Sequence, residues 1–294
     1  MKRTLLIICL LANLTCFSQQ LPNNLSMADK VYGLSKFWQE VNYNFVYLDQ
    51  VDRKAWDSTY KALIPQVSQS KNDYEYYRLM ARFCAMLKDG HTGVFVPGSV
   101  GSLMFGKMFG KYWFSLEEVD GKAIVNRVLK SELNEIPIGT EVVSVNGMPT
   151  RQYAKENCEP YIFSSTDYVR ERYGIQNLLS GLLGESYDVT FKKPDGRTFS
   201  LHLTHARTTD TAFYPSFPKY PLLELKWYPG KVAYLALNGF GDDKIDSMFI
   251  AKLPELYQAK GLIIDLRNNG FCCTGFGTSI LQYLIKDTLM QHSR

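Results

Sequence analysis

The chain contains 294 residues, of which 46% are hydrophobic and 21% are charged, and its formal net charge at pH 7 is +4. This length is sufficient for two or three domains, each with its own hydrophobic core. The small net charge and the lack of a basic stripe argue against a nucleic-acid partner.

The N-terminus has the pattern of an export signal. A basic pair follows Met1, and the apolar run from Thr4 to Leu14 is too short to span a bilayer. The pattern predicts a signal peptide over residues 1–18, cleavage before Gln19, and an exported protein that is periplasmic, associated with the cell envelope, or secreted. Two alternatives stay open: a lipidated Cys16, which is the one case in which we expect membrane contact, and a buried N-terminal strand or helix.

Residues 26–97 predict a small helical unit. Apolar side chains recur there at steps of three and four residues, which is the period of an amphipathic helix. Asn72 or Asp73 is the expected N-cap of the third helix, and Asp89 with Gly90 ends it. The inward positions of the three helices are Val31, Leu34, Trp38, Val41 and Phe45, then Trp56, Tyr60, Leu63, Ile64 and Val67, then Tyr76, Leu79, Met80, Phe83, Cys84 and Leu87.

Residues 110–206 predict a compact module of strands and helices. Gly147 and Gly196 mark turns, and the second turn joins two strands in a hairpin. The run from Ile138 to Gly147 resembles the core of a PDZ domain. The expected strands are 112–118, 122–128, 140–145, 187–192 and 198–204, and the stretch 150–183 is expected to be largely helical.

Residues 207–221 contain Thr, Ser and Pro and predict a linker to a last domain over 222–294. A strand over 231–237, a helix after Asp243 and a strand from Gly261 have the spacing of a βαβ unit. Two strands and two helices cannot bury both faces of a parallel sheet, so we expect this domain to be truncated. The predicted fold class is multi-domain α+β and α/β.

The strand that begins at Gly261 is β-branched and apolar, which predicts a buried strand that delivers a polar loop to the edge of a parallel sheet. A helix pattern from Phe276 to Ile285 follows the loop. Backbone N–H groups in such a loop can bind an anion or a developing oxyanion. Asp265 and Arg267 are predicted to form a structural ion pair that supports the loop.

The cysteines and histidines are scattered along the chain. Without a Cys-x-x-Cys motif or a Cys/His cluster, the sequence predicts no metal site and no cofactor. Cys84 is expected to be a buried thiol. A bridge between Cys272 and Cys273 would be strained, and no partner spacing supports a cysteine nucleophile. His202 and His205 are expected to be solvated at a strand end.

Two motifs carry a family resemblance. The segment from Asp265 to Gly270 resembles the Asp-Leu-Arg-x-Asn-x-Gly signature of the tail-specific (C-terminal processing) serine proteases and the related tricorn core. The segment from Leu87 to Thr92 resembles the Asp-Gly-His-Thr motif of the tricorn-like branch. Both motifs and the PDZ-like run stand in family order, and the resemblance implies a ClpP/crotonase-like protease core over 222–294.

The resemblance assigns roles to individual residues. It implies that His91 is the general base, although a lone histidine at a helix end is otherwise most often a cap or a satisfied polar residue. The family's nucleophilic serine lies C-terminal to the Asp-Leu-Arg segment, beyond Arg294, so residues 1–294 are expected to be inactive. Gly270 and Phe271 are candidate backbone donors of an oxyanion hole. The family has a second glycine where this chain has Phe271, which implies a loop of changed shape or impaired oxyanion binding.

The leading hypothesis is an exported serine-type endopeptidase that acts on polypeptides, represented by a portion without its nucleophile. The polypeptide is expected to bind by its C-terminus, through strand addition in the PDZ-like groove. One alternative is a non-catalytic peptide-binding protein on the same scaffold, which the missing serine and the altered loop favour. A second alternative, binding of an apolar ligand, rests on the likeness of retinoid-binding proteins to this fold.

Overall fold

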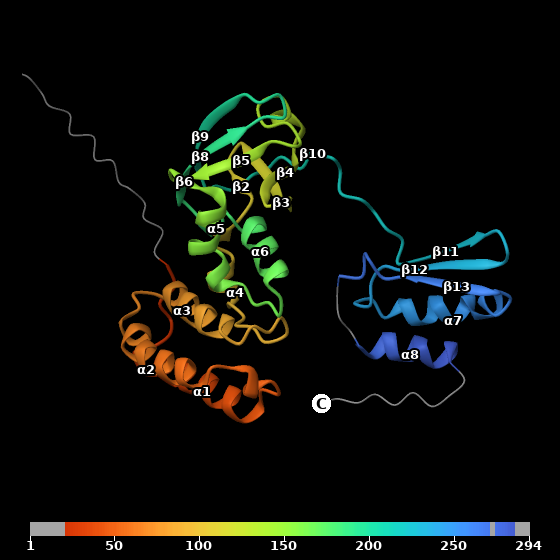
Figure 1. Cartoon of the computed structure of the whole chain (residues 1–294), viewed down its shortest axis with the longest axis horizontal. Coiled ribbons are helices and arrows are strands. Elements are labelled where there is room, and N and C mark those ends of the chain that lie inside the picture. The colour runs from red at the N-terminus through yellow and green to blue at the C-terminus, as the bar shows by residue number, and fades with distance from the viewer. Residues whose placement is uncertain (1–20, 271–273, 286–294) are drawn as a thin grey trace, which may run out of the picture. The chain divides into compact units, whose positions relative to one another are not determined.

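The computed structural model describes residues 21–270 and 274–285. The chain divides into two compact units, one through Pro215 and one from Ser216 (Figure 1). Helices and sheets, most of whose strand pairs are antiparallel, make up the described residues, which confirms a mixed α+β fold. None of the described helices is long and apolar enough to cross a membrane.

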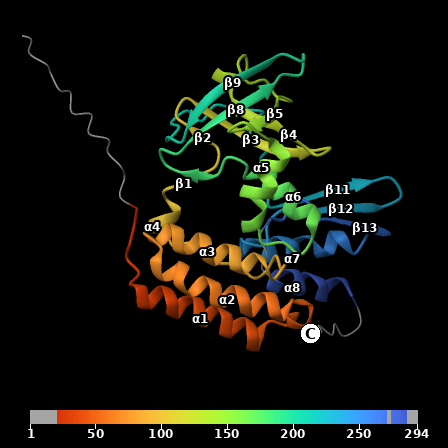
Figure 2. The ribbon, with the colours of Figure 1, turned by 60° about the vertical axis from the view of Figure 1, so that its left-hand side comes forward.

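Three helices lie side by side in the first unit, as predicted (Figure 2). Each begins where a side-chain oxygen of Ser26, Asp52 or Asn72 accepts a hydrogen bond from a backbone N–H in the first turn. Such caps satisfy donors that a helix start otherwise leaves free. The helices are α1 (Met27–Asn44), α2 (Arg53–Gln69) and α3 (Asp73–Ala85).

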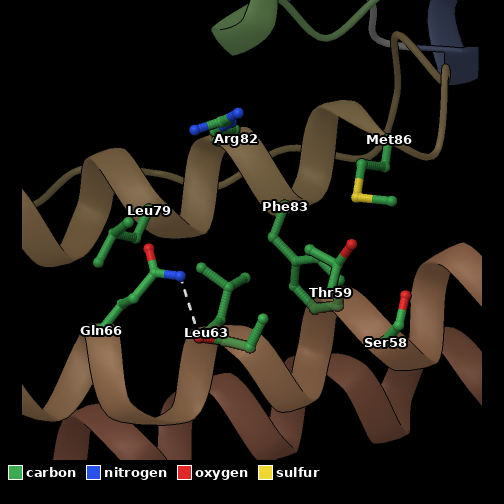
Figure 3. Close-up of a pocket in the computed structure, with 9 residues that line it drawn as sticks. Ser58, Thr59, Leu63, Gln66, Leu79, Arg82, Phe83 and Met86 are labelled. Atoms are coloured by element: carbon green, nitrogen blue, oxygen red, sulfur yellow. Dashed lines mark hydrogen bonds between the residues drawn. The ribbon is translucent and has the colours of Figure 1, made fainter.

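Aromatic rings form the centre of this helical layer. The rings of Trp56 and Phe83 stack with their centroids 3.9 Å apart, and the ring of Phe37 meets both edge-on. Trp56 and Phe83 are fully buried. Figure 3 shows Phe83 and Leu63 directed into the space between α2 and α3. The apolar period that predicted three helices therefore also identifies the residues that hold them together.

An antiparallel sheet forms the rest of the first unit. Its strands lie in the order β2-β3-β4-β5-β8-β9, and two short helices pack beside it. The main strands are β3 (Tyr112–Val119), β4 (Lys122–Leu129), β5 (Glu141–Val145), β8 (Ser186–Lys192) and β9 (Thr198–Thr204). The short strands are β1 (Met104–Phe105), β2 (Met108–Phe109), β6 (Met148–Pro149), β7 (Gly181–Leu182) and β10 (Phe213–Tyr214). The remaining elements are η1 (Leu48–Gln50), α4 (Gly98–Gly101), η2 (Lys130–Glu132), α5 (Thr150–Asn157), η3 (Glu159–Tyr161) and α6 (Asp167–Gln176).

Turn chemistry fixes the register of this sheet. Asn146 and Gly147 have φ values of 50° and 76° between the paired residues Val145 and Met148. Two positive φ values in a two-residue loop define a type I′ hairpin, for which Asn-Gly is favoured. Gly196, with φ of 90°, turns the chain between β8 and β9. Both turn predictions are confirmed.

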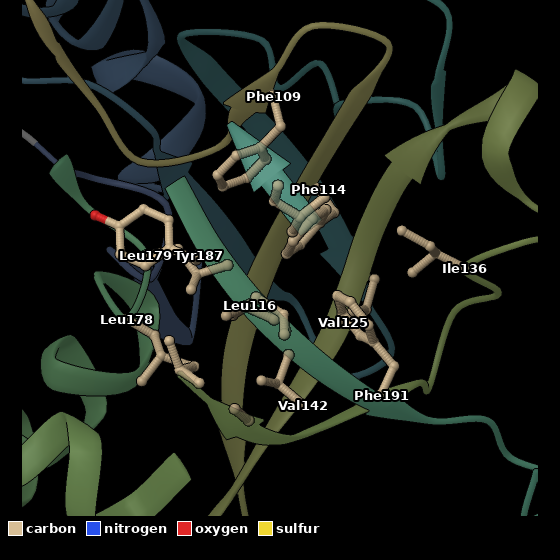
Figure 4. Close-up of a cluster of buried hydrophobic side chains, with 14 of the residues drawn as sticks. Phe109, Phe114, Leu116, Val125, Ile136, Val142, Leu178, Leu179, Tyr187 and Phe191 are labelled. Carbon is tan, nitrogen blue, oxygen red and sulfur yellow. The ribbon is translucent and has the colours of Figure 1, made fainter. Parts of the chain in front are cut away.

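The core of the sheet module is aromatic and aliphatic (Figure 4). Phe114 and Phe191 meet edge-to-face at 5.8 Å between centroids, and Phe114 stacks on Phe109 at 5.4 Å. Leu178 and Leu179, which follow α6, are also fully buried in this cluster. Side chains from the sheet and from the segment after α6 therefore share one core.

The segment 207–221 contains both a strand and the unit boundary. Within it β10 pairs antiparallel with β4, with Phe213 opposite Leu129. The boundary between the compact units follows Pro215. The first half of the predicted linker thus belongs to the sheet module.

The second unit is built on a three-stranded sheet with the order β11-β12-β13. β12 and β13 are parallel and are joined through α7, so the predicted βαβ unit is confirmed. The antiparallel strand β11 was not predicted. The elements are β11 (Leu223–Tyr228), β12 (Val232–Leu237), α7 (Lys244–Leu256), β13 (Gly261–Asp265) and α8 (Thr274–Leu284).

The prediction that β13 is a buried strand is wrong. Leu262, Ile263 and Ile264 are 37%, 49% and 37% exposed. The physical reason is that β13 is an edge strand, which in the described residues pairs with β12 alone. By contrast, the inward residues of β12 are covered, and Leu235 packs in a core with Phe249 of α7.

Candidate active site

His91 lies on an irregular segment directly after α3. Lys88 adopts a left-handed conformation, with φ of 50°, and turns the chain away from the helix axis. The His91 side chain is 90% exposed, and its Nδ1 atom lies 3.8 Å from Oδ1 of Asp89. An exposed imidazole with a neighbouring carboxylate is free to exchange a proton with an incoming group.

The Asp89 carboxylate is itself held in place. Its Oδ2 atom accepts a hydrogen bond from the Thr92 hydroxyl at 2.6 Å. Burial by itself would raise the pKa of Asp89, but the hydrogen bonds from Thr92 and from the backbone N–H groups of His91 and Thr92 outweigh it and lower the pKa. Asp89 therefore stands ionised beside the imidazole at neutral pH. The Gly90 N–H donates to the Ser165 hydroxyl at 3.1 Å and ties the segment to the loop before α6.

A small apolar cavity lies near this segment. Its volume is about 200 Å³, and its lining includes Val94, Val96, Tyr161 and Phe163. Gly93 permits the close approach, because a Cβ atom there would lie 3.3 Å from the Phe163 ring. Sequence reasoning missed this cavity, since its walls come from segments that are distant in the chain.

The second unit contains a polar cluster centred on Asp265. The Arg267 guanidinium donates to both carboxylate oxygens, with Nε 3.0 Å from Oδ1 and Nη2 2.6 Å from Oδ2. The Tyr234 hydroxyl also donates to Oδ2, at 2.6 Å. Hydrogen bonds from the Arg267 side chain, then from Tyr234 and the Arg267 N–H, hold the pKa of Asp265 far below its usual range. Sequence reasoning missed Tyr234, because its contact depends on the β12–β13 register.

The loop after β13 begins with a turn in which the Asn269 N–H donates to the Leu266 carbonyl at 2.9 Å. The Asn269 side-chain oxygen accepts from the Phe240 N–H at 3.1 Å, which joins the loops after β12 and β13. Gly270 is exposed, and a Cβ atom there would meet nothing within 4 Å. Phe271, and with it half of the candidate oxyanion loop, lies outside the described residues, as do Cys272 and Cys273.

The site residues thus form two separate groups. In the first unit His91 stands with Asp89 and Thr92. In the second unit Asp265 stands with Arg267 and Tyr234, beside a polar cavity of about 430 Å³. The two groups lie in separate compact units, and each is described by itself.

The prediction that His205 is solvated is wrong. Its side chain is 1% exposed, and the two ring nitrogens lie 2.9 Å from the Met108 carbonyl and 2.7 Å from the Leu179 carbonyl. The reason is tertiary: the chain after β9 pairs with Phe109, whose ring stacks on the imidazole. His202 is exposed as predicted and lies 2.7 Å from Asp188 Oδ1.

The prediction that Cys84 is a buried thiol is confirmed. Burial raises the pKa of the Cys84 thiol to about 12, and burial does the same for Cys158. Both thiols therefore stay protonated at neutral pH, where a thiol is a weak nucleophile.

No model of a known protein family matches the sequence, and no curated protein matches it. The fold, in contrast, matches solved structures. Mature CPAF complexed with lactacystin superposes with a TM-score of 0.52 at 14% identity, over 87% of this chain and 59% of that one. The described chain shares the fold of mature CPAF.

A second structure of mature CPAF gives a TM-score of 0.50 at 14% identity, over 83% of this chain and 56% of that chain. The photosystem II D1 C-terminal processing protease gives a TM-score of 0.34 at 16% identity, over 87% of this chain and 65% of that chain. At this identity, the likeness to CPAF shows the fold alone. The chain spans 59% of the length of the CPAF chain that it matches.

Proposed function

We propose that this chain is part of an exported serine-type endopeptidase of the tail-specific protease family, in the tricorn-like branch, with His91 as its general base. One observation carries the proposal: an exposed imidazole has an ionised carboxylate, held by Thr92, 3.8 Å from its Nδ1 atom. A base with a carboxylate beside it is one arrangement that activates a serine nucleophile. The fold shared with CPAF supplies independent support.

The chemistry follows from this arrangement. His91 Nε2 takes the proton from a serine hydroxyl as that oxygen attacks the peptide carbonyl, and the same nitrogen later gives the proton to the leaving amine. The negative charge of Asp89 orients the ring and stabilises the imidazolium that forms between these steps.

The nucleophile and the oxyanion donors are assigned by family resemblance. In that family the serine lies C-terminal to the Asp-Leu-Arg segment, so we propose that no serine within residues 1–294 is the nucleophile. Backbone N–H groups at Gly270 and Phe271 are the proposed oxyanion donors. Asp265 and Arg267 support that loop through their ion pair.

The proposed substrate is a polypeptide that binds by strand addition. The two residues of β2 pair with Tyr112 and Trp113, and the Phe114 N–H donates to the Lys107 carbonyl at 3.3 Å. From Ser115 onward, β3 pairs with β4 alone in the described residues. This leaves one edge of β3 open to an extended segment, and main-chain hydrogen bonds along such an edge would supply affinity. α6 lies beside β3, where Arg172 donates to Glu117 at 2.7 Å.

A histidine replacement tests the catalytic proposal. In a form of the protein that carries the nucleophile, His91→Ala should lower kcat by about three orders of magnitude or more. His202→Ala is the matched control, because that histidine is also exposed and also faces an aspartate, Asp188. Near-normal peptide hydrolysis by folded His91→Ala would reject His91 as the base and favour a serine–lysine dyad.

Three further measurements test the finer parts of the proposal. Residues 1–294 should not react with a serine-directed fluorophosphonate, and stoichiometric labelling of one serine would overturn the placement of the nucleophile. Phe271→Gly should raise activity if the phenylalanine impairs the oxyanion hole, where one donor is worth about 3 kcal/mol. Secreted material should begin at Gln19, and an intact Met1 would contradict export by signal cleavage.

A non-catalytic peptide-binding protein is the second candidate. The observation that favours it is the open edge of β3 in a sheet that is otherwise well packed. It predicts saturable binding of a peptide C-terminus together with no hydrolysis in any longer form of the protein. Hydrolysis that depends on His91 would exclude it.

A further inference from the structure

A second cavity in the first unit is unusually rich in cations. Its volume is about 360 Å³, within the range of roughly 300–1,000 Å³ that is usual for ligand pockets. The C-terminal part of α3, the turn before His91, α5, η3 and α6 all contribute to its wall. The cations are Arg82, Lys88, Lys155 and Arg170, and the one acidic residue of the lining is Glu159.

The acidic residue does not neutralise this set. Glu159 lies 3.9 Å from Arg170 and 3.9 Å from Arg151, so two guanidinium groups already face it. Arg170 has a further partner in Asp167, at 2.6 Å. In the described parts of the chain, no carboxylate lies within ion-pair distance of Arg82, Lys88 or Lys155. Three uncompensated cations therefore line one cavity.

The negative ends of two helix dipoles offset only part of the positive charge of these three cations. Arg82 and Lys155 stand in the last turns of α3 and α5, where a cation is favoured by the helix dipole. Each helix end supplies about half a negative charge, so the two together offset roughly one of the three cations. Figure 3 shows Arg82 on the side of α3 that faces away from Leu63 and Phe83, so its guanidinium is not held in the helical core.

The rest of the lining is apolar. Ala85, Met86, Pro160 and Ile162 form these parts of the wall, and they can contact the methylene groups of a bound acidic side chain. Arg82, Lys88 and Lys155 are exposed, so they can reach its carboxylate from solvent. Arg82 can also offer two parallel N–H donors to the two oxygens of a carboxylate. The cavity is therefore suited to a compact group with a negative charge and an apolar stem.

We propose that this cavity binds Asp or Glu side chains of the polypeptide on which the protein acts, an inference that rests on the proposed function. Lys88 stands three residues before His91 on the same segment, which places acid recognition next to the proposed base. An acidic residue bound there would position the neighbouring peptide bonds of the substrate. The substrate class is thus a polypeptide with an acidic segment near the cleaved bond.

Equilibrium binding tests this proposal without any need for catalysis. The probe is a fluorescein-labelled peptide with four consecutive Glu residues, and its counterpart has Gln at the same positions. In fluorescence anisotropy at low salt, the Glu peptide should bind at least roughly tenfold more tightly than the Gln peptide, as expected when charge-assisted hydrogen bonds are lost. Its affinity should fall as salt is added.

Variants locate the binding. Lys155→Gln and Arg82→Gln should each weaken binding of the Glu peptide several-fold, since each removes one of the uncompensated cations. Lys155 is exposed, so its replacement leaves the fold intact. Lys61→Gln is the matched control, because it removes the same charge from an exposed position on α2 that does not line the cavity, and it should leave the affinity unchanged.

Several outcomes would overturn the proposal. Equal affinity for the Glu and Gln peptides would exclude recognition of the acidic side chains. An equal loss on Lys61→Gln would show non-specific attraction instead of a site. Tighter competition by inorganic phosphate or by a short oligonucleotide than by unlabelled Glu peptide would assign the cavity to a different ligand. Because His91→Ala should not change this binding, failure here and failure of the proposed catalysis are distinguishable.

Discussion

The helical layer of the first unit and the edge strand β13 of the second unit use apolar residues in opposite ways. In the helical layer of the first unit, the Trp56 and Phe83 rings stack at 3.9 Å and are fully buried. In the second unit, Ile263 on the edge strand β13 is 49% exposed. Burial is what makes an apolar side chain stabilising, so apolar residues hold the helical layer together and contribute little on the exposed edge strand.

Truncation of one residue in each region gives the largest expected contrast. Phe83→Ala should lower the free energy of unfolding of the first unit by about 4 kcal/mol, because it leaves a cavity beside Trp56 and Phe37. Ile263→Ala, the paired control, should cost less than about 1 kcal/mol. Urea denaturation followed by circular dichroism would measure both costs, with a separate transition fitted for each unit. Comparable losses of unfolding free energy at the two positions would show that exposure does not distinguish them.

Two helical glycines sharpen the same contrast at a smaller scale. Gly33 lies on α1, where a Cβ atom would stand 2.3 Å from the Tyr76 hydroxyl. Gly33→Ala should therefore destabilise the first unit by about 1–3 kcal/mol, despite the better helix propensity of alanine. Gly275 on α8 has nothing within 4 Å of the equivalent position, so Gly275→Ala should gain up to about 0.5 kcal/mol.

The steric cause can be isolated with a double variant. Tyr76→Phe removes the hydroxyl that the new methyl group would meet. In that background Gly33→Ala should cost less than it does alone, and thermal unfolding of the four proteins of the cycle would give the coupling energy. Additive effects would show that the glycine serves some other purpose.

Local patterns predicted the elements of the fold well. The Asn72 cap and the apolar period located α3, and the Asn-Gly pair located the hairpin after β5. The errors concern position in the sheet. The composition of β13 does not reveal whether a strand is central or at an edge, since that depends on how many strands pair with it.

The predictions for the candidate site also differ between contacts of near residues and contacts of distant segments. The Asp265–Arg267 ion pair joins residues two apart, and the sequence predicted it. The contact of Asp89 with His91 also joins residues two apart, but it was not predicted. Tyr234 reaches Asp265 only through the parallel register of β12 and β13. His205 is buried because Phe109, far away in the sequence, covers it. Contacts between distant segments have no local signature, and single-sequence reasoning missed both.

The smallest expected effect is on the stability of the second unit at low pH. The folded-state pKa of Asp265 lies far below its unfolded value, through hydrogen bonds from Arg267 and then Tyr234. Its contribution is therefore fully present above the unfolded value, near pH 4, and is lost as pH falls toward the folded value. Asp265→Asn should make the stability of the second unit less dependent on pH below about pH 4. Asp195→Asn is the control: the pKa of Asp195 is also lowered by Arg197, but this pair lies in the first unit and should leave the acid response of the second unit unchanged. An acid transition of the second unit that is the same with and without the Asp265 carboxylate would show that other groups control it, and that this cluster orients the loop without adding to stability.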